Sequence, residues 1–195
     1  MMLSEEDGAI AVSTARKAVE AECRGGVTDF PQGVLFSEPA GVFVTISEYP
    51  SGYLRGCIGY PEPVFPFGEA LIRAAVSACH DPRFYPLTSV EAKECTVEVT
   101  RLTPPEELMF KDTADMLSQI ELGRDGVILE AFGHRALFLP QVAPEQGWNK
   151  SGMFDALSRK AGLRTDAWKE PGVRVWTFRG EIFSETEPYG RAERR

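Results

Sequence analysis

The residues best suited to chemistry lie in the stretch LRGCIG, residues 54–59, where an arginine and a cysteine stand two positions apart. The stretch follows a turn after a β-branched segment, so we expect a strand, in which side chains point to alternate faces. If Leu54 and Ile58 enter a core, the two polar side chains project together from the opposite face. A guanidinium near a thiol stabilises the thiolate. We therefore predict that Arg55 binds an anionic group and that Cys57 acts as nucleophile or thiol acid/base.

Glycine in the middle of a strand is costly unless a bend, a ligand or another backbone comes close. Gly56 and Gly59 are accordingly candidate substrate-contacting positions. A purely structural interpretation stays open: Cys57 is then a small buried residue, and Arg55 pairs with a carboxylate.

A nucleophilic thiol also needs a base, and the stretch SACHDPRF, residues 77–84, offers one. His80 stands at an expected helix end beside Asp81. The aspartate could orient the imidazole so that it acts as a base for the Cys57 thiol. The helix dipole alone also favours a histidine there. Asp81 and Arg83 form either an ion pair that fixes the loop or a ligand-facing corner.

The proline-bounded stretch LPQVAPEQGW, residues 139–148, is a third candidate. Gln141 could offer hydrogen bonds to a ligand, or the loop could simply cover the sheet. His134 falls at an expected hairpin tip, where a solvated turn residue is the default.

Hydrophobic periodicity and turn residues predict helices and strands in alternation, but not in strict βαβ units. Helices are expected at 4–23, 67–80, 112–120 and 151–161, and strands at 42–48, 53–60, 95–102, 173–178 and in a hairpin over 125–142. The pattern favours an α+β fold with a mixed or antiparallel sheet flanked by helices. We expect one domain over 1–195, with a smaller second lobe and a boundary near 103–110.

Composition narrows the classes of function. The chain has 195 residues, 43% of them hydrophobic, and a net charge of -8, which argues against broad nucleic-acid binding. The basic end GRAERR, residues 190–195, is expected to be a frayed, solvated tail. The chain lacks a signal-like start and an apolar run of about 18 residues, so we expect a cytoplasmic, soluble protein without membrane contact.

Four cysteines occur without any spacing typical of a metal site, so we predict free thiols, no metal and no cofactor. The sequence does not indicate an oligomeric state.

Several segments occur in a fixed order: GVFVTI (41–46), LRGCIG (54–59), DPRF (81–84) followed by Pro86, LGRDGV (122–127), LFLPQV (137–142) with Trp148, and KAGL (160–163). This succession resembles the AMMECR family, whose hallmark is the LRGCIG hexapeptide, over about residues 5–185. The resemblance implies a cytoplasmic α+β domain with a larger and a smaller lobe and with the hallmark residues near a cleft. Carried over by match, these residues are Leu54, Arg55, Gly56, Cys57, Ile58, Gly59, Asp81, Pro82, Arg83, Phe84, Pro140 and Gln141.

The family has no settled activity, so two hypotheses stay open. The first is an enzyme or enzyme subunit that acts through Cys57 on a small anionic, nucleotide-derived or peptide-derived substrate. The second is a non-catalytic adaptor. Prokaryotic members look like the A component of a three-part system with a Memo-like protein and a radical SAM protein, which are therefore the implied partners.

Overall fold

The computed structural model describes residues 3–195, and the chain contacts divide it into two compact units. Unit 1 runs to Thr103 and resumes with Glu181–Arg195, and unit 2 is Pro104–Gly180. The assigned strand pairs in both units are antiparallel, and helices accompany the strands in each. This confirms the α+β class with a helix-flanked sheet. Within residues 3–195, no helix is both long and apolar enough to cross a membrane.

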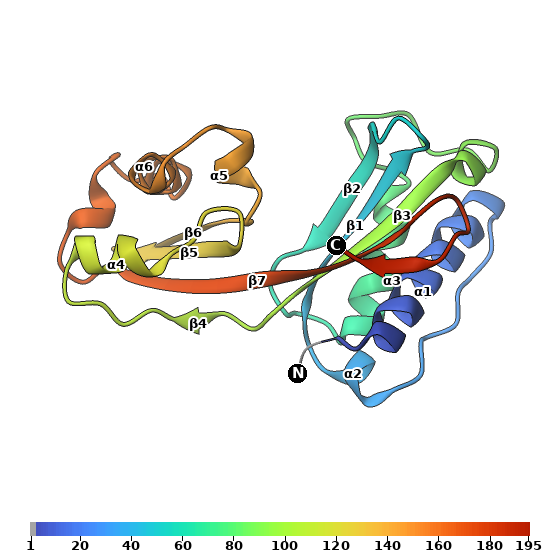
Figure 1. Ribbon diagram of the computed structural model, residues 1–195, viewed down its shortest axis with the longest axis horizontal. Coiled ribbons are helices and arrows are strands. Elements are labelled where there is room, and N and C mark those ends of the chain that lie inside the picture. Colours follow the sequence, from blue (N-terminus) through green and yellow to red (C-terminus); the bar gives the residue numbers. More distant parts are fainter. Residues whose placement is uncertain (1–2) are drawn as a thin grey trace. The chain divides into compact units, whose positions relative to one another are not determined.

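Unit 1 is built on a sheet in which β1 lies between β2 and β3, and β3 lies between β1 and β7 (Figure 1). Its strands are β1 Gly41–Glu48, β2 Leu54–Tyr60, β3 Cys95–Leu102, the end of β7 Arg174–Glu185, and β8 Ala192–Arg194. Its helices are α1 Glu5–Arg24, α2 Val34–Ser37 and α3 Phe67–Ala78, with the 3-10 turn η1 Glu91–Glu94 before β3. β2 is the terminal strand of this order, so one of its edges is not paired with another strand.

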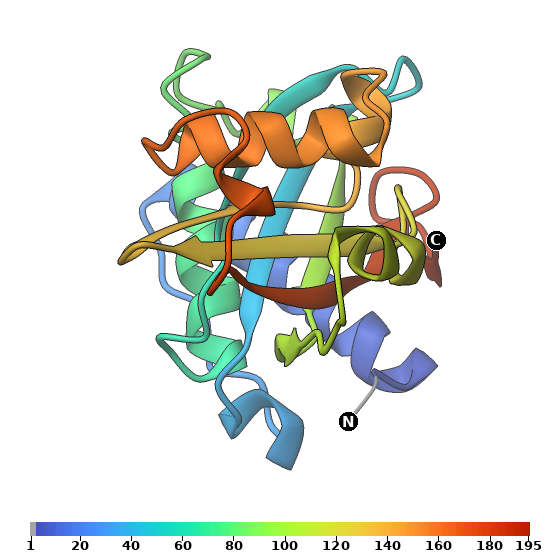
Figure 2. The same ribbon diagram turned by 90° about the vertical axis from the view of Figure 1, so that its left-hand side faces the viewer.

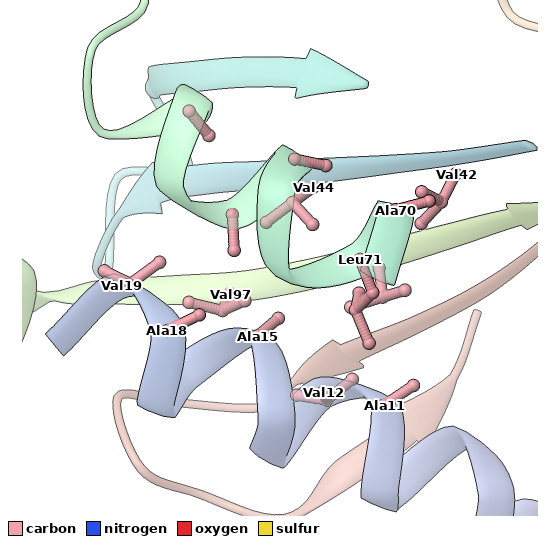
Figure 3. Packing of buried hydrophobic residues seen from close by; sticks show 14 of the residues in the cluster. Ala11, Val12, Ala15, Ala18, Val19, Val42, Val44, Ala70, Leu71 and Val97 are labelled. Carbon is pink, nitrogen blue, oxygen red and sulfur yellow. The ribbon is translucent and has the colours of Figure 1, made fainter. Parts of the chain in front are cut away.

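Capping residues define both ends of helix α1. Ser4 and Asp7 form a reciprocal capping box, and Gly25 ends the helix in the left-handed conformation at φ 74°. Small apolar residues on one face, among them Ala11, Ala15 and Ala18, are buried against the core (Figure 3). Their size lets α1 pack closely against α3 and the sheet.

Alternate residues of the strands contribute to the core of unit 1, because successive side chains of a strand point to opposite faces of the sheet. Val42 and Val44 of β1 and Val97 of β3 point to the same face and are fully buried under α1 and α3 (Figure 3). The residues between them on β1, such as Thr45, point to the other face. This division decides which strand side chains can form a site.

Unit 2 has a smaller sheet of its own, with β5 between β6 and β7. Its elements are β4 Glu106–Glu107, α4 Thr113–Gln119, β5 Asp125–Ala131, β6 His134–Phe138, α5 Val142–Glu145, α6 Lys150–Lys160, η2 Ala167–Lys169 and the first part of β7. Figure 2 presents this unit to the viewer, with α6 in orange. Phe154 and Leu157 of α6 are fully buried in its core with Trp168.

The expectation of a frayed C-terminal tail is wrong. Residues 192–194 form β8, which pairs with Phe183–Glu185 of β7. The Arg194 guanidinium donates to the Leu3 carbonyl at 2.6 Å and stacks over the Phe183 ring at 4.6 Å. The tail is ordered because it satisfies backbone groups and covers an aromatic ring.

A buried ion pair joins α1 to the end of β7. The Arg16 side chain is buried and donates to Glu185 with Nε–Oε1 at 2.9 Å, and also to the carbonyls of Ala92 and Cys95. Glu185 in turn accepts the backbone N–H of Val97 at 2.9 Å. Breaking a buried pair on one side leaves an uncompensated charge, which is costly.

We expect Arg16→Met to lower the free energy of unfolding by about 3–5 kcal/mol, measured by urea denaturation at pH 7. The matched control is Glu69→Ala, which removes an exposed pair with Arg73 within α3. Because exposed helical pairs contribute about 0.5 kcal/mol or less, that variant should be nearly neutral. Equal effects of the two substitutions would contradict this account.

Candidate functional site

The Asp81 carboxylate ties the turn after α3 to the middle of β2. Its side chain is 1% exposed. Oδ2 accepts the backbone N–H of Cys57 at 2.9 Å and Nη2 of Arg83 at 2.6 Å. Oδ1 accepts Nε of Arg83 at 2.9 Å and its backbone N–H at 3.0 Å. Both carboxylate oxygens are therefore fully engaged within unit 1.

These donors hold the carboxylate in its charged form. The Arg83 guanidinium, with smaller contributions from the backbone N–H groups of Cys57 and Arg83, keeps the pKa of Asp81 well below its usual range despite burial. Asp81 likewise raises the pKa of Arg83. Arg83 Nη2 also lies 3.3 Å from the Cys57 carbonyl oxygen. Asp81 thus accepts the backbone N–H of Cys57, and Arg83 donates to its backbone carbonyl.

Gly56 explains why the α3 turn can come so close to β2. A Cβ atom on this residue would lie 2.2 Å from the Ala78 carbonyl oxygen and 3.7 Å from the Asp81 Cβ. The nearest obstacle is backbone, which cannot move aside as a flexible side chain could. The glycine is thus required for close approach of the helix end, which is one of the reasons for strand glycine.

Gly59 has a different neighbour. A Cβ there would lie 2.2 Å from the Val42 carbonyl and 2.6 Å from the ring of Phe43, its cross-strand partner. The space over Gly59 is filled by that ring. Both glycines of the hexapeptide therefore have packing roles in unit 1, beside the substrate-contacting role predicted for them.

A β-bulge changes the face to which Arg55 points. Ile46 pairs with Gly56, but Ser47 pairs with Leu54, so Arg55 is the extra residue. The bulge places Leu54 on the side of Ser47 and brings Arg55 to the side of the helices. The expected common face of Arg55 and Cys57 is therefore wrong, because simple alternation does not hold across a bulge. Leu54 is 38% exposed, although Ile58 does pack against the core.

Arg55 is buried among residues of the segment between α3 and β3. Its Nη2 lies 3.2 Å from Glu91 Oε1 and 3.4 Å from the Pro86 carbonyl, and its guanidinium stands 5.8 Å from the Phe84 ring centre. Hydrogen bonds from Thr88, and then the contact with Arg55, hold the pKa of Glu91 below its ordinary value. Arg55 thus has a carboxylate partner, as the structural interpretation requires.

A small cavity of about 130 Å³ lies beside this ion pair. We call it the Arg55 pocket; it is lined by Glu48, Tyr49, Arg55, Glu91, Glu94 and Cys95. Within residues 3–195, no group of three metal-ligating side chains is placed to hold an ion.

Cys57 lies on the other face of β2, partly exposed. Its sulfur accepts the hydroxyl of Thr45, its cross-strand partner, at 3.3 Å. His80, the predicted base, is directed elsewhere: its Nε2 lies 2.8 Å from Glu22 Oε1 of α1. Among the hydrogen bonds of the described residues, none joins His80 to Cys57.

Gln141 belongs to unit 2, where it is exposed and its carbonyl accepts the Glu145 N–H in the turn of α5. The structure thus brings Arg55, Gly56, Cys57, Asp81 and Arg83 together in unit 1. Their close packing around the α3 turn is the geometry of the site.

Sequence reasoning missed Glu91, the carboxylate partner of Arg55. A signal was present in TSVE, residues 88–91, which has the spacing of a capping box. Thr88 and Glu91 do cap each other: Glu91 Oε2 accepts both the N–H and the hydroxyl of Thr88 at 2.8 Å. That cap orients Glu91 toward Arg55.

Comparison with known proteins gives matches over nearly the whole chain. A model of the AMMECR1 family matches residues 12–183, which includes both units. The chain belongs to the AMMECR1 family. Protein MJ0810 of Methanocaldococcus jannaschii is 42% identical, with 97% of this chain and 95% of that protein covered. A protein of Methanocella arvoryzae is 45% identical, with 97% and 96% covered.

A solved structure from the same family shows a similar fold. It is the crystal structure of the uncharacterised protein PH0010 from Pyrococcus horikoshii, with a TM-score of 0.83 and 38% identity. The match covers 99% of this chain and 98% of that one. This AMMECR1 chain therefore shares its fold over 99% of its length with that uncharacterised protein.

We expect Asp81→Asn to lower the free energy of unfolding by about 2–3 kcal/mol at pH 7, because an amide cannot accept all the donors around it. The folded-state pKa of Asp81 is lowered, so its contribution is present above its unfolded pKa of about 3.9 and is lost as pH falls below that value. The difference between wild type and variant should therefore shrink by about 1 kcal/mol from pH 6 to pH 3.

Urea denaturation of both proteins at each pH measures this difference. Exposed Asp29, replaced by Asn, is the control and should show almost no difference at either pH. A gap for Asp81→Asn that stays constant or widens in acid would refute the assigned role.

Proposed function

We propose that this AMMECR1-family chain is a partner-binding domain, whose docking surface is the rim of the Arg55 pocket. The observation that carries the proposal is a contrast between the hallmark residues and their sequence neighbours. The polar groups of Arg55, Asp81 and Arg83 are bonded within unit 1. Large apolar neighbours of these residues are left exposed to solvent.

One exposed side chain lines the pocket, and the others are next to, or within two residues of, pocket residues or residues that contact Arg55. They are Tyr49, Tyr53, Tyr85 and Val90, with exposures of 46%, 72%, 90% and 68%. Tyr49 lines the pocket itself, and Tyr85 lies between two residues that contact Arg55. Exposed aromatic residues that rim a concave site are typical of protein interfaces.

The outer edge of β2 argues for docking through side chains rather than by strand addition. β2 is a terminal strand, and such edges can pair with a foreign strand. At Cys57, however, the outward N–H is bonded to Asp81 and the outward carbonyl to Arg83. This cap supports a partner that contacts the tyrosines instead.

The resemblance of this chain to the A component of a three-part system suggests the partner. We propose a Memo-like protein as the direct partner and a radical SAM protein as the third component, all in the cytoplasm. We also propose that the two units act together as a single domain, since the family match spans both.

We expect the double variant Tyr53→Ser, Tyr85→Ser to bind the Memo-like protein of the same genome at least about tenfold more weakly, because interface aromatics carry much of the binding energy. Isothermal titration calorimetry with purified proteins gives the Kd. Cys57→Ser should bind like wild type. Val27→Ser, with a side chain 96% exposed elsewhere in unit 1, is the matched control.

Unchanged affinity in the double variant would overturn the proposed surface. No measurable binding by wild type would overturn the proposed partner. An equal loss in Val27→Ser would show that the effect is not specific to the rim.

The partly exposed thiol of Cys57 favours a second candidate function, an enzyme site on the opposite face of β2. Thr45 donates to its sulfur, and Nη2 of Arg83 lies 3.3 Å from the Cys57 carbonyl oxygen. In this hypothesis Cys57 attacks a small anionic, nucleotide-derived or peptide-derived substrate, with Arg83 rather than Arg55 supplying positive charge. A substrate or another chain would have to provide the base.

This hypothesis predicts that iodoacetamide alkylates Cys57 at least about tenfold faster than Cys23 at pH 7, because burial raises the pKa of Cys23 and the thiolate is the reacting form. Arg83→Gln should slow the reaction of Cys57 several-fold and leave that of Cys23 unchanged. Mass spectrometry of the alkylated peptides follows both rates. Equal, slow alkylation rates at the two cysteines would contradict the nucleophile role of Cys57. They would have no bearing on the docking proposal.

A further inference from the structure

The ends of α1 and α3 bring two cysteines together that lie far apart in the sequence. Cys23 is in the last turn of α1, and Cys79 directly follows α3. Their sequence neighbours are in direct contact, since His80 Nε2 lies 2.8 Å from Glu22 Oε1. The ends of the two helices therefore lie close together beside these cysteines.

The cysteines also share a common neighbour. The Cys23 sulfur donates to the Leu87 carbonyl at 3.4 Å, and the Leu87 N–H donates to the Cys79 carbonyl at 2.8 Å. Leu87 therefore contacts the side chain of Cys23 and the backbone of Cys79. Cys23 packs against the same core cluster that contains Cys79.

The two thiols differ in access. Cys79 is 1% exposed, whereas Cys23 is partly exposed. A reagent from solvent therefore reaches Cys23 first, and Cys79 stands behind it as the second thiol. An accessible cysteine backed by a neighbouring thiol is the arrangement of a reversible oxidation site.

We propose that Cys23 and Cys79 form such a site, at which a peroxide converts the two thiols into a disulfide that links α1 to α3. This inference is independent of the proposed docking function and of Cys57.

The chemistry balances in two steps. The Cys23 thiolate attacks one peroxide oxygen, the O–O bond breaks, and Cys23 becomes a sulfenic acid while hydroxide leaves. The Cys79 sulfur then attacks the Cys23 sulfur, the S–O bond breaks, and water leaves with the Cys79 proton. In total, hydrogen peroxide takes two electrons from the two sulfurs, and two thiols yield one disulfide and two waters.

Burial raises the pKa of the Cys23 thiol and raises that of Cys79 to about 12. Because the thiolate is the reacting form, the site should oxidise slowly at neutral pH. The rate should climb roughly tenfold per pH unit while Cys23 remains mostly protonated. The site thus responds to strong or prolonged oxidation rather than to trace peroxide.

The other two cysteines are placed differently. Cys95 is 2% exposed at the start of β3, and Cys57 is on β2 with its sulfur beside Thr45. β1 lies between these strands, and the two side chains point to opposite faces of the sheet. A Cys57–Cys95 disulfide is therefore not expected, so Cys57 can serve as an internal control.

The test treats the full chain with hydrogen peroxide at pH 8 and maps disulfides by non-reducing peptide mass spectrometry. We expect a cross-linked pair of peptides containing Cys23 and Cys79, reversible by dithiothreitol. Circular dichroism confirms that the protein stays folded. The cross-linked protein should melt about 5–10 °C higher than the reduced protein, because the link closes a long loop.

Two variants sharpen the result. Cys23→Ser should abolish the cross-link, and it replaces the partly exposed thiol, so folding should survive. Cys57→Ser should leave the cross-link unchanged. The proposal is overturned if Cys57 is oxidised in wild type while no Cys23–Cys79 disulfide forms. It is equally overturned if the link appears only in unfolded protein.

Discussion

The carboxylate of Asp81 is the constraint on which the site of this protein depends. It is buried, charged, and bonded to the backbone of β2 and to Arg83 at the same time. A buried carboxylate is tolerated only when such donors surround it. The turn after α3 must therefore stay against the middle of β2, and the segment leading to β3 follows from there.

The hexapeptide and the DPRF turn are two halves of one interaction. Gly56 gives the turn room to approach, Cys57 offers its backbone N–H, and Arg55 reaches across to Glu91 in the next segment. These residues act mainly through backbone atoms and internal ion pairs. A motif that looks catalytic in the sequence therefore serves to hold the turn after α3 against β2.

The same arrangement places the proposed docking surface and the Cys57 thiol on different faces of β2. Arg55 and Asp81 are engaged inside unit 1, whereas tyrosines and aliphatic side chains near the pocket face solvent beside the exposed carboxylates of Glu48 and Glu94. Cys57 stands apart, on the other face of the strand, with Thr45 as its neighbour. Partner docking and thiol chemistry would thus use opposite sides of one strand, and each can be lost without the other.

The sequence alone determined the fold class and most of the longer helices and strands, because capping residues, alternation and turn residues act locally. The strand expected at 95–102 is β3, and the helix expected at 4–23 is α1 within one residue at each end. Only the tertiary structure decided what is non-local: the bulge that turns Arg55 toward Glu91, the ordered tail, and the position of Leu87 against both Cys23 and Cys79. Each depends on contacts between distant segments, which local patterns do not encode.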